Sequence, residues 1–173
     1  MPATSSLNQV STVATTAAHS AWNVVGDFVV VLALVVLLFL LARYVGRGSF
    51  VTAVISLYAG FALYQQFPYL GMLGNASGSA LIAEKIALYL AASFVAYLVV
   101  RRVIVSEFLY INAVGLIVLS VVTAGFLLAL AFALFDVPSV YTFTPPIVAL
   151  FAPKQYFYAW FVAPLAGLFF LTR

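Results

Sequence analysis

Long runs of apolar residues, separated by short charged or polar stretches, fill most of this chain. The first run, Phe28–Ala42, has fifteen residues without a polar side chain, which as a helix would cover about 22 Å. The hydrocarbon core of a membrane is about 30 Å thick. We therefore expect the span to extend over Val24–Val45, with Asp27 at one headgroup layer and the long side chain of Arg43 reaching the other.

Three further runs of this kind predict three more spanning helices. They are Phe50–Tyr64, Ile86–Val100 and Leu109–Phe135, and none of them contains proline, as an unbroken helix requires. The last run would be about 40 Å long as a helix, so we expect it to tilt or to protrude from the membrane.

A fifth run, Tyr156–Leu171, allows two interpretations. It is short, contains Pro164 and opens with a cluster of aromatic residues. Because aromatic rings of this density favour the interface between lipid and water, the run is either a kinked span or a helix that lies in the interfacial plane. The stretch before it, Asp136–Pro153, contains four prolines and predicts an extended, stiff connection.

The composition sets the class of protein. Hydrophobic residues make up 66% of the 173 residues and charged residues 6%, with a mean hydropathy of +1.22. In soluble domains about 45–50% of residues are apolar and about 25% are charged. Soluble enzymes, nucleic-acid-binding modules and disordered chains are therefore excluded. The sequence predicts an all-α integral membrane helical bundle with four spans and a fifth C-terminal helix that is kinked or interfacial. There is no cysteine, which excludes disulfides and thiolate sites.

The chain is expected to have two parts. Residues 1–26 carry no charged side chain and place apolar residues at three- and four-residue steps, the pattern of a weakly amphipathic helix lying on the outer leaflet. Residues 27–173 form a single transmembrane helical domain.

Basic residues predict the orientation, because cytoplasmic loops carry an excess of Lys and Arg. With the N-terminus outside, only Lys85 and Lys154 fall on the outer side. Five arginines then fall on the inner side, where they can contact lipid headgroups: Arg43, Arg47, Arg101, Arg102 and Arg173. We therefore expect an outer N-terminus and, if the fifth run spans, a cytoplasmic C-terminus.

Chemically active groups are scarce inside the expected spans. All ionisable side chains fall at span ends, which disfavours a proton-coupled transporter, since that class needs a titratable group near the midplane. The polar residues on the fourth span, Asn112, Ser120 and Thr123, more often bond to a neighbouring helix than line a pore. The single histidine, His19, has no partners that predict a zinc site or a catalytic triad. We expect no enzymatic activity, no cofactor and no nucleic-acid partner.

Three carboxylates offer one further alternative. Asp27, Glu84 and Asp136 all fall on the outer side, at the ends of different helices. If they converged, their oxygens could bind a divalent cation. Anchoring of the helix ends explains the same residues equally well.

Small residues recur at four-residue steps on two of the spans. Thr52, Ser56 and Gly60 share one face of the second span, and Gly125 and Ala129 share one face of the fourth. Such faces let helix backbones approach closely, which favours helix association in lipid. The pattern therefore predicts either a tight bundle or an oligomer interface.

Asp27 before the first span, Gly46-Arg47-Gly48 after it and Gly60 in the second span form one further arrangement. Over roughly residues 27–135 it resembles the colicin V production (CvpA-like) family of small bacterial inner-membrane proteins. The resemblance implies a multi-pass protein of the bacterial plasma membrane, linked to toxin export and envelope maintenance and without enzymatic activity.

The function expected is that of a non-enzymatic membrane protein that packs, within the lipid bilayer, with itself or with partner membrane proteins. The alternative is a small channel or transporter subunit that conducts between the second and fourth spans. A lytic pore former of the holin type is disfavoured, because such proteins usually carry a strongly charged tail and only Thr172-Arg173 follows the last run.

Overall fold

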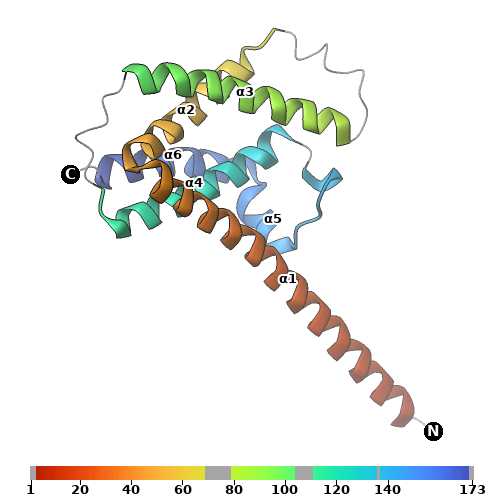
Figure 1. Ribbon diagram of the computed structural model, residues 1–173. Coiled ribbons are helices and arrows are strands. Elements are labelled where there is room, and N and C mark those ends of the chain that lie inside the picture. Colours follow the sequence, from red (N-terminus) through yellow and green to blue (C-terminus); the bar gives the residue numbers. More distant parts are fainter. Residues whose placement is uncertain (1–2, 69–78, 104–110, 136, 172–173) are drawn as a thin grey trace.

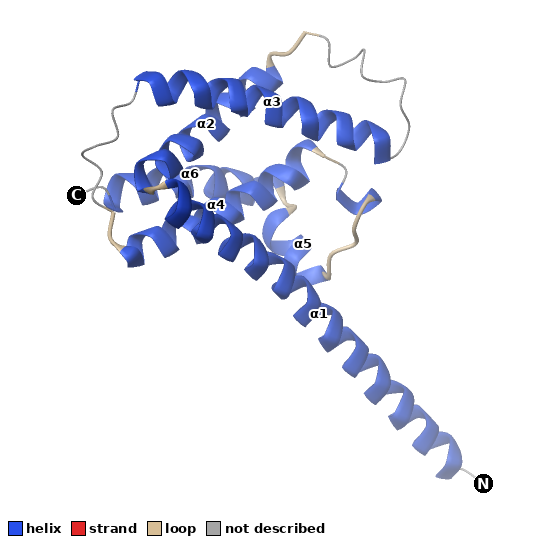
Figure 2. Ribbon diagram, viewed as in Figure 1, coloured by secondary structure: helices blue, strands red, loops and turns tan. Residues whose placement is uncertain are grey.

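The computed structural model describes residues 3–68, 79–103, 111–135 and 137–171. Within these ranges helices joined by short loops make up the chain, and there is no strand (Figure 2). The elements are α1 (Ala3–Val45), α2 (Arg47–Gln65), α3 (Ser79–Val103), α4 (Ala113–Leu134), the short 3-10 helix η3 (Val137–Ser139), α5 (Pro145–Phe151) and α6 (Lys154–Leu171). Four stretches are long and apolar enough to cross a membrane: Ala21–Val45, Arg47–Gln65, Ala80–Arg102 and Ala113–Leu134. The predicted membrane helical bundle with four spans is confirmed.

The first helix is much longer than a membrane requires. α1 has 43 residues, about 65 Å at 1.5 Å per residue, against a hydrocarbon core of about 30 Å. Its N-terminal half stands clear of the rest of the molecule (Figure 1). Residues 3–26 therefore continue the helix of the first span without a break, and how they lie relative to the outer leaflet stays a prediction.

A single residue joins α1 to α2. Gly46 has a φ of 100°, a left-handed conformation that glycine adopts without steric cost. Its carbonyl oxygen accepts a hydrogen bond from the backbone N–H of Phe50 at 3.0 Å, which starts α2. The chain therefore turns at Gly46, and the Arg47-Gly48 pair already belongs to α2.

Helices α4 and α6 run antiparallel along one another. Near the start of α4, Leu116 and Leu119 pack with Leu168 and Leu171 from the end of α6. Near the end of α4, buried residues contact Phe157 and Phe161 from the start of α6. α6 therefore packs along α4 although it contains Pro164. It is not among the four stretches that are long and apolar enough to cross a membrane, and the choice between a kinked span and an interfacial helix stays a prediction.

Helix α3 lies across α2 and packs mainly on it (Figure 1). The two backbones approach at Gly60, where a Cβ atom would lie only 2.6 Å from the Cα of Ser93. One turn away, the Tyr89 hydroxyl donates a hydrogen bond to the carbonyl oxygen of Leu57 at 3.2 Å. The missing side chain of Gly60 is what permits this crossing.

The structure corrects two expectations about the second half of the chain. The fourth span was expected to begin at Leu109 and to exceed the membrane, but α4 has 22 residues, about 33 Å. It begins after Asn112, whose side chain accepts a hydrogen bond from the N–H of Gly115 at 2.6 Å and so caps the helix. The proline-rich connection was expected to be extended, and this is wrong for Pro145–Phe151, which form α5. Pro145 and Pro146 occupy its first turn, where proline costs no hydrogen bond and its fixed φ suits the helix.

Candidate functional site

A buried carboxylate joins the first span to the connection between α4 and α6. Asp27 lies inside the apolar stretch of α1, yet only 2% of its surface is exposed. Its Oδ1 accepts a hydrogen bond from the Tyr141 hydroxyl at 2.8 Å. Its Oδ2 accepts two, from the backbone N–H of Thr144 at 2.5 Å and from the Thr144 hydroxyl at 2.6 Å. We call this arrangement of Asp27, Tyr141 and Thr144 the Asp27 latch.

The local sequence places both donors of the latch. Thr144 is the residue before α5, but its side chain donates to Asp27 instead of capping its own helix. Tyr141 packs edge-on against Phe143, with ring centroids 4.7 Å apart, and Phe143 in turn packs against Phe132 of α4. The aromatic contacts therefore hold the connection against the bundle, where its hydroxyl and amide donors meet the carboxylate.

The hydrogen bond to Asp27 changes the pKa of Tyr141. The hydrogen bond to the carboxylate raises the pKa of Tyr141 above its usual value, because the phenol would have to give up a proton held between the two groups. Tyr141 therefore stays protonated and keeps its role as a donor throughout the physiological pH range.

A hollow opens beside the latch. It has a volume of about 510 Å³, and both polar and apolar atoms line it. Trp22, Asn23 and Gly26 contribute from α1, and the stretch from Tyr141 to Thr144 contributes from the connection. Asp27 is thus covered by protein but lies close to the surface, at the outer end of the first span in the predicted orientation.

The predicted small-residue faces lie inside the molecule. Thr52 and Ser56 are buried and donate hydrogen bonds to the carbonyl oxygens of Gly48 at 3.0 Å and Thr52 at 2.6 Å, one turn back in α2. Gly60 meets Ser93 of α3. These residues therefore pack the bundle of one chain.

The second small-residue face packs against α6. A Cβ atom on Gly125 would overlap the indole ring of Trp160. Ala129 is buried in the cluster against which the same ring packs. The indole nitrogen of Trp160 also donates to the carbonyl oxygen of Leu150 at 3.1 Å, which fixes the ring.

The polar residues of the fourth span have three different roles. Asn112 is exposed and caps α4. Ser120 is fully buried and donates to the carbonyl oxygen of Leu116 at 2.8 Å. Thr123 is 1% exposed, and its hydroxyl makes no hydrogen bond.

The predicted basic residues lie exposed at helix ends. Arg43 is in the last turn of α1, Arg47 begins α2, and Arg101 and Arg102 end α3. Arg101 also lies over the Tyr97 ring, 5.9 Å from its centroid. Arg173 lies outside the described residues.

The carboxylates that could have formed a cation site do not cluster in the part of the chain that the structure describes. There, no three His, Cys, Asp or Glu side chains come together. Glu84 is exposed on α3, Asp27 is bound in its latch, and Asp136 lies outside the described residues.

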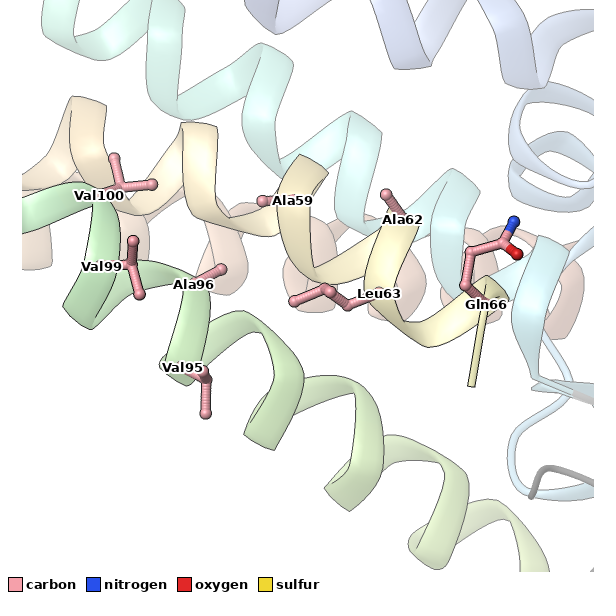
Figure 3. Close-up of a pocket in the computed structure, with 8 residues that line it drawn as sticks. All are labelled: Ala59, Ala62, Leu63, Gln66, Val95, Ala96, Val99 and Val100. Atoms are coloured by element: carbon pink, nitrogen blue, oxygen red, sulfur yellow. The ribbon is translucent and has the colours of Figure 1, made fainter. Parts of the chain in front are cut away.

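Between α2 and α3 lies a separate apolar groove of about 460 Å³ (Figure 3). Its lining consists of alanine and larger apolar residues, with the amide of Gln66 as the one polar side chain. The residues are Ala59, Ala62, Leu63 and Gln66 from α2, and Val95, Ala96, Val99 and Val100 from α3. The groove opens where the two helices diverge from their crossing, and its chemistry suits lipid chains.

Comparison with protein-family models, with curated proteins and with solved structures finds no match. The sequence suggested Asp27 only as a headgroup anchor or a cation ligand, and its hydrogen bonds with Tyr141 and Thr144 were not predicted. An aspartate inside an apolar stretch requires donors, and Tyr141 and Thr144 supply them from the proline-rich connection. The pairing itself is not visible in the sequence, because 114 and 117 residues separate these donors from Asp27.

Proposed function

We propose that the protein is a non-enzymatic multi-pass protein of the bacterial plasma (inner) membrane, with its N-terminus outside and its C-terminus in the cytoplasm. It acts by packing with itself or with partner membrane proteins. Its resemblance to the CvpA-like family suggests a role in toxin export or envelope maintenance.

The ends of the helices support this orientation. Ala42 near the end of α1, Phe50 near the start of α2 and Ile111 before α4 form one buried cluster, so these ends lie on one side of the bundle. Arg43 and Arg47 flank the same turn. An arginine-rich side of this kind is typical of the cytoplasmic face.

The observation that carries the proposed packing function is the free face of α1. The spanning part of α1 has a mean hydropathy of 3.1, the highest of the four spans, but only 6% of it is buried within the chain. Val25, Val29, Leu32, Val36 and Leu40, at three- and four-residue steps, form an exposed stripe along it. The Asp27 latch holds this helix to the bundle, so the stripe is presented on a fixed element. A stripe with this spacing matches the seam of paired helices.

Cysteine cross-linking tests this packing function directly, since the chain contains no cysteine. We expect Leu32→Cys in native membranes to give a disulfide-linked dimer under mild oxidation, because Leu32 is 60% exposed on the stripe. The matched control is Leu34→Cys, which lies at nearly the same depth but faces α4 and α5 and should stay monomeric.

A partner other than a second copy is detected by placing a photo-cross-linking amino acid at position 32 in the same membranes. Protein adducts at position 32 and none at position 34 support packing through the stripe. The proposal is overturned if position 32 gives neither a dimer nor a protein adduct and labels lipid alone.

The second candidate is a small channel or transporter subunit, favoured by the polar hollow beside Asp27. A carboxylate at the mouth of such a hollow would attract cations. Ion flux into liposomes that hold the purified protein decides between the two functions. We expect flux no greater than in empty liposomes, whereas flux that Asp27→Asn reduces would establish the channel.

A further inference from the structure

A second apolar cavity, of about 450 Å³, lies between the first four helices, and we call it the four-helix cavity. Leu41 of α1, Phe50 of α2, Tyr97 of α3 and Thr123 of α4 are among its lining residues, and its surface is almost entirely apolar. Leu41 and Phe94 line it and are also exposed on the outside of the bundle. The cavity therefore opens toward the hydrocarbon layer.

The four-helix cavity reaches the end of the bundle that carries the arginines. Leu41 lies four residues before the end of α1, and Phe50 lies three residues after the start of α2. Tyr97 lies six residues before the end of α3. Because all three line one cavity, the end of α3 lies on the same side of the bundle as the turn between α1 and α2.

Arg101 continues the cavity face of α3. Leu90, Phe94 and Tyr97 line the cavity at steps of four and three residues, and Arg101 follows Tyr97 by four, so the four residues share one face of the helix. The Arg101 guanidinium lies over the Tyr97 ring, 5.9 Å from its centroid. Since this ring lines the cavity, the charge of Arg101 lies at the rim of the cavity.

Arg47 has the same relation to α2. Phe50, Val54 and Leu57 line the cavity, and Arg47 precedes Phe50 by three residues and Val54 by seven, steps that place them on one face of a helix. Arg47 and Arg101 are both exposed. A long arginine side chain covers apolar surface with its stem and keeps its charge at the interface with water. Two cationic groups therefore flank the same end of the cavity.

These two charges have no counter-ion at this end in the part of the chain that the structure describes. The carboxylates of that part are Asp27 and Glu84. Asp27 lies 18 residues before the end of α1, and Glu84 lies in the second turn of α3, far from its arginine end. Guanidinium groups bind phosphate oxygens through strong, often bidentate hydrogen bonds. A molecule with a hydrocarbon chain for the cavity and a phosphate for the arginines is a phospholipid.

The charge also selects the class of headgroup. Two guanidinium groups attract a phosphate but repel the ammonium group of a zwitterionic headgroup, so a headgroup with net negative charge is favoured. We propose that the four-helix cavity binds one acyl chain of an anionic phospholipid, whose phosphate contacts Arg47 and Arg101. The site differs from general attraction between surface arginines and headgroups, because its chain lies between the helices.

A photoreactive phosphatidylglycerol that carries a diazirine in one acyl chain tests this site. The full-length protein is placed in nanodiscs of dioleoylphosphatidylcholine with increasing fractions of this probe, and labelled peptides are identified by mass spectrometry after illumination. We expect labelling of the cavity residues Ala53 and Tyr97 to saturate at one lipid per chain. A phosphatidylcholine with the same diazirine chain should label them far less.

Two pairs of arginine variants are matched in charge. Arg101→Gln should raise the probe fraction at half-saturation about tenfold, the effect of one lost hydrogen bond to a charged group. Arg102→Gln removes the same charge from the next residue, about 100° around the helix, and should have little effect. In the same way Arg47→Gln should weaken labelling, whereas Arg43→Gln, about 200° around α1 from Leu41, should not. All four side chains are exposed, so each variant should fold.

A variant of the cavity itself tests where the acyl chain lies. Ala53→Leu narrows the cavity while both arginines remain, and it should abolish the labelling of Tyr97. Thermal unfolding of this variant in the same nanodiscs shows whether the bundle is intact. If an intact Ala53→Leu protein is labelled at Tyr97 like the wild type, the chain does not enter the cavity and the proposal fails.

Three further results would overturn the lipid site. The first is labelling that rises in proportion to the probe without saturating. The second is equal labelling by the phosphatidylcholine probe, since the cavity would then accept the chain of any lipid. The third is equal weakening by Arg101→Gln and Arg102→Gln, which would assign the attraction to the surface charge as a whole. Failure of the cross-linking at Leu32 would leave this site unaffected, because Leu32 does not line the cavity.

Discussion

Replacing Gly60 by alanine is expected to lower the free energy of unfolding by about 2–3 kcal/mol, as overpacking of a tight contact does. The added Cβ would lie 2.6 Å from the Cα of Ser93 and closer still to its hydroxyl. Backbone atoms cannot rotate away, so α2 and α3 must separate. Because α3 packs mainly on α2, this separation removes most of what holds α3 to the bundle.

The matched control is Gly26→Ala on α1, where a Cβ atom meets nothing within 4 Å. There the intrinsic helix propensity of alanine should stabilise the protein by up to about 1 kcal/mol. The two substitutions are chemically identical and are expected to have opposite signs. Denaturant unfolding in detergent micelles, followed by circular dichroism, measures both.

The concentration dependence of unfolding separates a contact within one chain from one between chains. Since Gly60 meets Ser93 of its own chain, the loss caused by Gly60→Ala should not change with protein concentration. If the Gly60→Ala protein unfolds like the wild type, the backbones of α2 and α3 do not approach closely at Gly60. A loss that disappears on dilution would assign the glycine to an oligomer interface.

Removing the Asp27 carboxylate should cost about 2–3 kcal/mol, because hydrogen bonds to a charged group are strong and three of them are lost together. In Asp27→Ala, Thr144 loses the partner of both its amide and its hydroxyl, and Tyr141 loses the partner of its hydroxyl. The connection before α5 is then no longer tied to α1. We therefore expect faster protease cleavage between residues 137 and 144 as well as lower stability.

Two further substitutions grade the effect of the latch. Tyr141→Phe removes one donor and leaves the carboxylate bound by Thr144, so it should cost about 1 kcal/mol. Asn23→Ala changes an exposed residue of the same hollow and should be neutral. If the Asp27→Ala protein is cleaved by protease as slowly as the Asn23→Ala protein and is equally stable, the carboxylate does not hold the connection.

The sequence predicts the four spans because lipid imposes a simple rule: an apolar run long enough to cross must be a helix. The same rule says little about α5 and α6. α5 begins with two prolines, and proline favours the first turn of a helix although it disrupts the interior of one. In α6, aromatic residues of the kind found at interfaces pack against α4 instead, as Phe157 and Phe161 show.

The candidate sites were predictable only in part. The spacing of Thr52, Ser56 and Gly60 identifies a face that packs closely, but nothing in that spacing selects α3 as the neighbour. The Asp27 latch depends on contacts between segments that lie far apart in the sequence. Such contacts follow from how the helices are arranged, which local patterns do not specify.

The latch also has a consequence for biosynthesis. Asp27 enters the membrane with the first span, but Thr144 is made 117 residues later, about 6–23 s at roughly 5–20 residues per second. Until then the carboxylate has no donor from the chain and has to remain near water at the headgroups. α1 is therefore joined to the connection only after most of the chain has been made, when Thr144 and Tyr141 reach Asp27.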